Sequence, residues 1–111
     1  MNSLNVAILL GRIGTKVKKY NTLGDRPFCV FPLALNERKA NEETCTWVEC
    51  EAWGDQATII ERMNIEVGQE MLIRGKLRTR GATTVTGPKL VVVVMDIKIF
   101  PKKPKDKEKD N

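Results

Sequence analysis

The residues best suited to chemistry lie in a basic stretch from Gln69 to Arg80. Every second position near its end is basic, at Arg74, Lys76, Arg78 and Arg80. Because successive side chains of a β-strand point to opposite faces, this spacing predicts a strand with four cations on one face, about 6.6 Å apart. Nucleic-acid phosphates are the obvious anions to meet such a row. The alternative is a solvated strand face with Glu side chains opposite.

The other parity of the same stretch carries apolar or small residues. We expect Ile73 and Leu77 to support the core, so that truncation of either one destabilises the fold.

A second candidate strand runs from Thr46 to Trp53. One parity contains Val48, Cys50 and Ala52, and the other contains Trp47, Glu49, Glu51 and Trp53. Large aromatic side chains on a charged face need a contact, which favours a stacking platform for bases at Trp47 and Trp53. The alternative is packing at a subunit interface or under a loop. Glu49 and Glu51 would repel phosphates, unless they pair across the sheet with the basic row.

The inventory of reactive side chains argues against an enzyme. The chain has no His, a single Ser (Ser3) and no P-loop or dinucleotide glycine pattern, so we expect no catalytic site and no cofactor. Cys29, Cys45 and Cys50 are odd in number and lack CxxC spacing. We therefore expect no metal site and three reduced, partly buried thiols.

Composition indicates one domain. The 111 residues carry a net charge of +5, of which the segment 101–111, with five Lys and three acidic residues, supplies +2. We expect a folded domain over 1–100 and a disordered charged tail over 101–111. No apolar run reaches membrane-span length and no signal peptide is evident, which favours a soluble, cytoplasmic protein without a membrane partner.

The remaining elements follow from periodicity and turn residues. We expect strands at 4–10, continuing as a half-strand at 17–20 after a bend at 11–14, and at 28–36, 46–53, 69–80 and 89–100. The second strand should bury Cys29, Phe31, Leu33 and Leu35, and residues 37–44 should form a long, exposed hairpin loop. A helix should begin with Asp55 as its N-cap, use the spacing of Gln56, Ile59, Ile60 and Met63, and end at Asn64.

The order of these elements defines the fold class. Three strands, one helix and two strands suit an all-β five-stranded OB-fold barrel with its helix between strands 3 and 4, although periodicity also allows another small β-barrel. In the first strand Val6, Ile8 and Leu10 alternate with Ala7 and Leu9, so both faces are apolar. Such a strand is covered by core on both sides or pairs with another subunit.

Several segments resemble bacterial single-stranded DNA-binding proteins over about residues 4–99. The segments are 5–14, Tyr20 with Gly24, 33–38, 46–47 with 53–54, and 68–80, which ends Gly-Lys-Leu-Arg-Thr-Arg. The resemblance implies an OB-fold homotetramer, or alternatively a dimer, that binds and protects single-stranded DNA without sequence preference in replication, recombination and repair. It implies stacking by Trp47 and Trp53, phosphate contacts from the basic row with Arg38 and Lys39, and pairing of the first strands across subunits.

The chain departs from that family in places. Lys39 stands where the family often has an aromatic residue, Glu49 where it often has Arg, and Gly81-Ala82 where a basic residue and Trp are usual. The end of the chain is not the family's acidic tip, so contact with replication proteins by that route is not expected. Two rivals share the fold: a dimeric primosomal assembly protein and an RNA-binding protein of translation.

Overall fold

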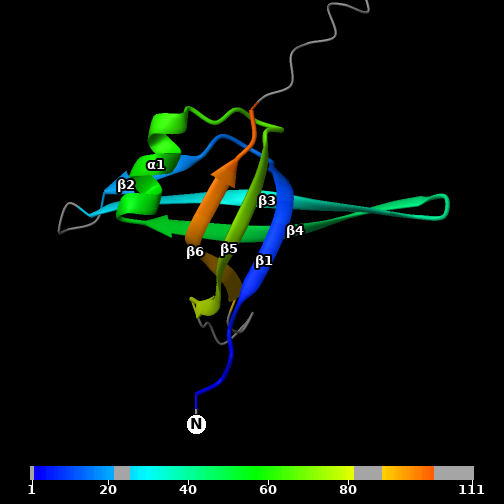
Figure 1. Ribbon diagram of the computed structural model, residues 1–111, viewed down its shortest axis with the longest axis horizontal. Coiled ribbons are helices and arrows are strands. Elements are labelled where there is room, and N and C mark those ends of the chain that lie inside the picture. The colour runs from blue at the N-terminus through cyan, green and yellow to red at the C-terminus, as the bar shows by residue number, and fades with distance from the viewer. Residues whose placement is uncertain (1, 22–25, 82–88, 102–111) are drawn as a thin grey trace, which may run out of the picture.

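The computed structural model describes residues 2–21, 26–81 and 89–101 (Figure 1). Its elements are β1 (Ala7–Ile13), β2 (Lys18–Asn21), β3 (Pro27–Lys39), β4 (Glu42–Trp53), α1 (Asp55–Met63), β5 (Glu70–Arg80) and β6 (Lys89–Ile99). Most of the expected turn at 21–25, of the loop at 81–88 and of the tail at 101–111 lies outside the described residues. No helix among the described residues is long and apolar enough to cross a membrane.

The strands form one sheet that closes on itself. Its order is β1-β5-β6-β4-β3-β2, and β1 also pairs with β3. Every pairing is antiparallel except that of β4 with β6. β1 and β2 are the two halves of the expected first strand, so α1 lies between the third and fourth strands of a five-stranded barrel. The predicted architecture is confirmed.

Closure takes place where β1 passes from β5 to β3. Arg12 opposes Glu70 of β5 and also Ala34 of β3. A Cβ at Gly11 would lie 2.6 Å from the Ala34 carbonyl oxygen, so a residue without a side chain permits this close approach. The prediction that the strand bends at 11–14 is therefore wrong for most of this segment, because β1 continues through Gly11 to Ile13.

The barrel interior holds the predicted core. Cys29, Phe31 and Leu33 are buried, and Leu35 packs against them. The valine run in β6 is also largely internal, since Val91, Val92 and Val94 are buried and Val93 is half-buried. Burial raises the pKa of the Cys50 thiol to about 12 and that of Cys29 to about 11, and Cys45 is exposed.

The helix differs from the expectation at its beginning and on its inner face. Asp55 is the first helical residue instead of the N-cap, which is Gly54 with a φ of 58°. Ala57 and Ile60 are buried, whereas Ile59 and Met63 are exposed because α1 contacts the barrel along a narrow line. Its end at Asn64, in the left-handed conformation, agrees with the prediction.

The exposed hairpin expected at 37–44 is present, but the prediction of a long loop is wrong. β3 and β4 remain paired as far as Lys39 and Glu42, and only Ala40 and Asn41 form the turn. We call residues 36–46 the hairpin arm, which projects far from the barrel (Figure 1). Its side chains are polar and exposed, so no hydrophobic pattern marks it, but the two strands satisfy each other's backbone hydrogen bonds.

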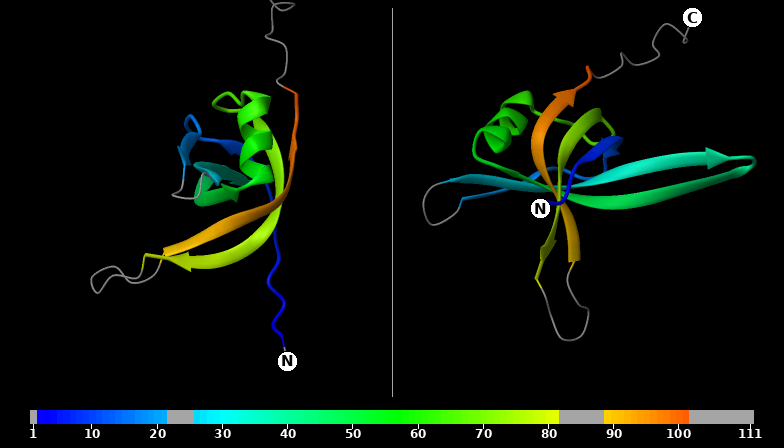
Figure 2. Two further views of the ribbon diagram at one scale, coloured as in Figure 1. Left: turned by 90° about the vertical axis from the view of Figure 1, so that its left-hand side faces the viewer. Right: turned by 60° about the horizontal axis from the view of Figure 1, so that its bottom comes forward.

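The expected core role of Leu77 is also wrong. The inward parity of β5 buries Met71, Ile73 and Gly75, but Leu77 is 45% exposed and Thr79 is exposed. The reason is that β5 and β6 continue past the core as a two-stranded ribbon (Figure 2). Parity places a side chain on a face, but the length of the barrel decides whether anything covers that face.

This difference predicts unequal losses of stability. Ile73→Ala should lower the free energy of unfolding by about 2–5 kcal/mol, because it leaves a cavity in the core. Leu77→Ala should cost about 1 kcal/mol or less, since its side chain is already half in water. Urea unfolding of the two variants and the parent would check this. Equal losses would show that the ribbon is covered in solution.

Candidate nucleic-acid interface

The outer face of β4 carries the residues that the parity of this strand predicts. Trp47 is 60% exposed and Trp53 is half-buried, while Val48, Cys50 and Ala52 point inward. Trp53 follows Trp47 by six positions, which puts the two tryptophans about 20 Å apart along the strand. One face of one strand therefore presents both aromatic side chains.

An open groove lies beside Trp53 on the same outer surface. It is lined by Arg26, Trp53, Arg78, Arg80, Val93 and Val94. Its side chains come from the residue before β3, the end of β4, the outer end of β5 and the middle of β6. The structure therefore brings half of the predicted basic row, Arg78 and Arg80, to one of the predicted tryptophans.

The Trp53 indole is held in place by three neighbours. The Phe28 ring lies against it, with 4.1 Å between ring centroids and planes inclined at 30°. The Arg26 guanidinium carbon is 5.4 Å from the indole centroid, within cation–π range. Trp53 Nε1 also donates a hydrogen bond to Glu51 Oε1, at 3.4 Å. The groove thus has a fixed aromatic wall.

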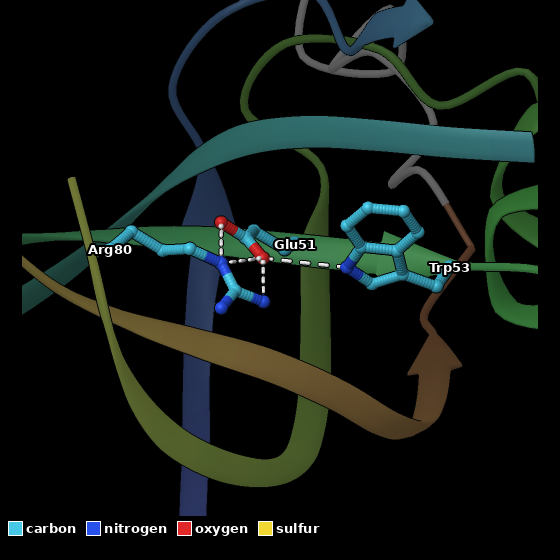
Figure 3. A network of polar contacts seen from close by, with 3 residues as sticks. All are labelled: Glu51, Trp53 and Arg80. Carbon is cyan, nitrogen blue, oxygen red and sulfur yellow. Dashed lines mark hydrogen bonds and ion pairs between the residues drawn. The ribbon is translucent and has the colours of Figure 1, made fainter. Parts of the chain in front are cut away.

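Glu51 is the centre of a polar network under the groove (Figure 3). Arg80 Nε lies 3.1 and 3.2 Å from its two carboxylate oxygens, and Arg80 Nη2 lies 3.0 Å from Oε1. The Glu51 side chain is 6% exposed and that of Arg80 42%. The predicted pairing of Glu51 with the basic row is confirmed, whereas Glu49 pairs instead with Lys89 of β6.

Arg74 lies away from the groove. It opposes Ile8 of β1 in the sheet, so the two side chains share the β1 side of the barrel, and its guanidinium forms an ion pair with Asp96. Because the barrel is closed, Arg74 at one end of the basic row lies on a different side of the molecule from Arg78 and Arg80 at the other end. Within the described part of the chain, neither Lys76 nor Arg78 has a carboxylate at ion-pairing distance.

Trp47 rests on the opposite end of the same face. A Cβ at Gly14 would collide with the six-membered ring of its indole, and it would lie 3.5 Å from Pro32 Cγ. One face of the indole therefore packs on Gly14, which has no side chain, while the rest of the ring is exposed to solvent. This is the geometry that stacking on a base needs.

Arg38 and Lys39 are not brought to the groove. They lie on the hairpin arm, about 30 Å along β3 from Phe28. Arg38 Nη2 is 3.5 Å from Glu43 Oε2, and Lys39 opposes Glu42. With Glu37, the arm carries three carboxylates against two cations, which weakens its attraction for phosphates.

The predicted oligomer strand leaves a row of apolar side chains uncovered. Val6, Ile8 and Leu10 are 52%, 67% and 55% exposed. Leu72, which opposes Leu10 across the β1–β5 pair, is 36% exposed. Exposed apolar rows of this kind commonly mark sites of protein–protein contact.

Sequence reasoning missed three residues that line the groove, Arg26, Val93 and Val94. Val93 and Val94 were assigned wholly to the core. It also missed Phe28, which does not line the groove but supports Trp53. Arg26 follows the turn, where no pattern fixes a side chain. The pairing of β6 with β4, which opposes Val93 to Glu51, brings these segments together and is not visible from local spacing.

Comparison with known proteins identifies the fold. Solved structures that match with TM-scores of 0.66 to 0.75 confirm the OB-fold. The single-stranded DNA-binding protein of Plasmodium falciparum, in complex with single-stranded DNA, has a TM-score of 0.75 at 22% identity. That match covers 91% of this chain and 98% of the other.

Two PriB proteins are also similar. PriB of Ralstonia solanacearum has a TM-score of 0.66 at 16% identity, covering 88% of this chain and 100% of that one. The dimeric N-terminal domain of PriB from Thermoanaerobacter tencongensis has a TM-score of 0.66 at 26% identity, covering 88% and 98%.

No curated protein matches the chain significantly. The family model, in contrast, matches almost the whole described fold, from residue 4 to residue 100. The chain therefore belongs to the single-strand binding protein family.

Proposed function

We propose that this protein binds single-stranded DNA without sequence preference and protects it in replication, recombination and repair. The observation that carries the proposal is one outer surface with two tryptophans and a cation-lined groove. Stacking is open to any base because every base has a π-face, and phosphate contacts carry no sequence information. Family membership supports the same ligand.

The proposed contacts divide according to the structure. Trp47 and Trp53 stack on bases, and Lys76 and Arg78, which have no carboxylate partner among the described residues, bind phosphates. Arg38 and Lys39 act as outer contacts for strands that reach the hairpin arm. Arg74 and Arg80 are already paired with carboxylates, so their share in phosphate binding is smaller. No chemical step is involved.

A second candidate function is a dimeric assembly protein of the primosome. It is favoured by the likeness to two PriB structures, one of them described as dimeric. Such a protein would act by contacting other replication proteins more than by coating DNA. Its surface would still bind a single strand, so subunit number separates it from the tetrameric coating protein.

Titration with oligo-dT while tryptophan emission is followed tests the main proposal. Emission should be quenched, and Trp47→Ala should weaken binding by about 1–3 kcal/mol, because one stacking ring is lost. Trp47→Phe is the matched control and should retain most of the affinity. Unchanged affinity in a folded Trp47→Ala variant would assign Trp47 to a subunit contact instead.

The proposed quaternary state is a homotetramer in which the β1 strands pair across subunits, with a dimer as the alternative. Sedimentation should give the mass of four chains, and Ile8→Asp should yield smaller species because it places a charge on the apolar β1 face. Ile59→Asp, at an exposed position on α1, is the control and should leave the mass unchanged. A monomeric parent protein at micromolar concentration would contradict both states.

A further inference from the structure

Glu51 is the one buried charged residue among those whose burial the structure describes, with 4% of the residue exposed. It lies on the outward parity of β4, where neighbouring side chains reach solvent, and it is covered by the wall of the groove. The groove is where we place the DNA strand. A carboxylate at this position needs a physical account, because it sits where negative charge opposes the proposed ligand.

The contacts of Glu51 show what it does to Arg80. Its two oxygens receive the Arg80 Nε–H and an Nη2–H, in a forked ion pair that uses the same donors with which Arg binds a phosphate. If a phosphate took both donors, Glu51 would keep only the Trp53 Nε1 hydrogen bond, at 3.4 Å. A buried carboxylate left without its cation is strongly unfavourable.

Arg78 provides the internal comparison. It lines the same groove from the same face of β5, two residues before Arg80. No carboxylate among the described residues lies at ion-pairing distance from it. Two neighbouring arginines in one groove therefore differ in whether their charge is already neutralised.

We infer that Glu51 sets the affinity of the site by occupying Arg80, so that Arg80 forms a fixed wall beside Trp53 and does not neutralise a DNA phosphate. The inference rests on the proposed binding of single-stranded DNA and deepens it. Glu51 is a positioning residue in this account. It holds the guanidinium and the indole edge together, and it lowers the number of phosphates that the groove can neutralise.

The test is the slope of log affinity for oligo-dT against log salt concentration. Glu51→Gln keeps the shape and an acceptor for Trp53 but frees the Arg80 charge, so the slope should steepen by about 0.7, the single-strand value for one phosphate contact. Glu51→Gln should bind oligo-dT more tightly than the parent, and the ratio of the two affinities should fall about 2.6-fold between 50 and 200 mM salt. Glu51→Gln with Arg80→Gln should abolish the added slope.

Two controls frame the result. Glu61→Gln removes the same charge from α1, on the cavity beside Cys29, and should leave the slope unchanged. Arg78→Ala should make the slope shallower by about 0.7, because its charge is available in the parent. Thermal melts verify that each variant is folded before its slope is used.

If the parent binds oligo-dT but Glu51→Gln leaves the slope unchanged, the inference is overturned and the proposed function stands. A parent that does not bind oligo-dT overturns both. If Glu51→Gln does not fold, the test uses the double variant Glu51→Gln with Arg80→Gln. A slope equal to that of the parent supports the inference. A slope shallower than that of the parent by about 0.7 shows that Arg80 contacts a phosphate and overturns it.

Discussion

The closure of the sheet through β1 is the constraint on which the rest of the structure depends. β1 pairs with β5 along most of its length and reaches β3 at Arg12 and Ile13, where Gly11 lets the two backbones approach. Because β5 bends around the closed barrel, alternate side chains such as those of the basic row point to different sides of the molecule. Arg74 consequently lies beside Ile8 on the β1 side, while Arg78 lines the groove.

Carboxylates then determine which cations remain for a ligand. Arg74 is paired with Asp96, Arg80 with Glu51 and Lys89 with Glu49. Exposed pairs such as the first add little to folding, but each lowers the attraction of its cation for an anion. The net charge of +5 already subtracts these carboxylates, so pairing changes where the excess positive charge lies on the surface and not its amount. Under the proposed function, stacking on the tryptophans would then carry a larger share of the binding.

Local periodicity predicted the fold well and the site in part. Alternation placed Phe31 and Leu33 in the core and both tryptophans outside, because a strand side chain has only two faces to choose from. It failed for Leu77 and for residues 37–44, since pattern does not show how far two strands extend past the core that covers them. It could not distinguish Arg78 from Arg80, because the partner of Arg80 comes from β4 and is set by the topology.

We propose that a single strand of DNA contacts Arg78, which has no carboxylate at ion-pairing distance among the described residues, and leaves Arg80 paired with Glu51. Side-chain ¹H–¹⁵N spectra of the Arg Nε–H groups, assigned by Arg78→Lys and Arg80→Lys and followed during titration with oligo-dT, test it most directly. We expect the Arg78 resonance to shift with added DNA, whereas the Arg80 resonance should move little because the Glu51 carboxylate holds its guanidinium. A shift of the Arg80 resonance equal to that of Arg78, or no shift at Arg78, would contradict it.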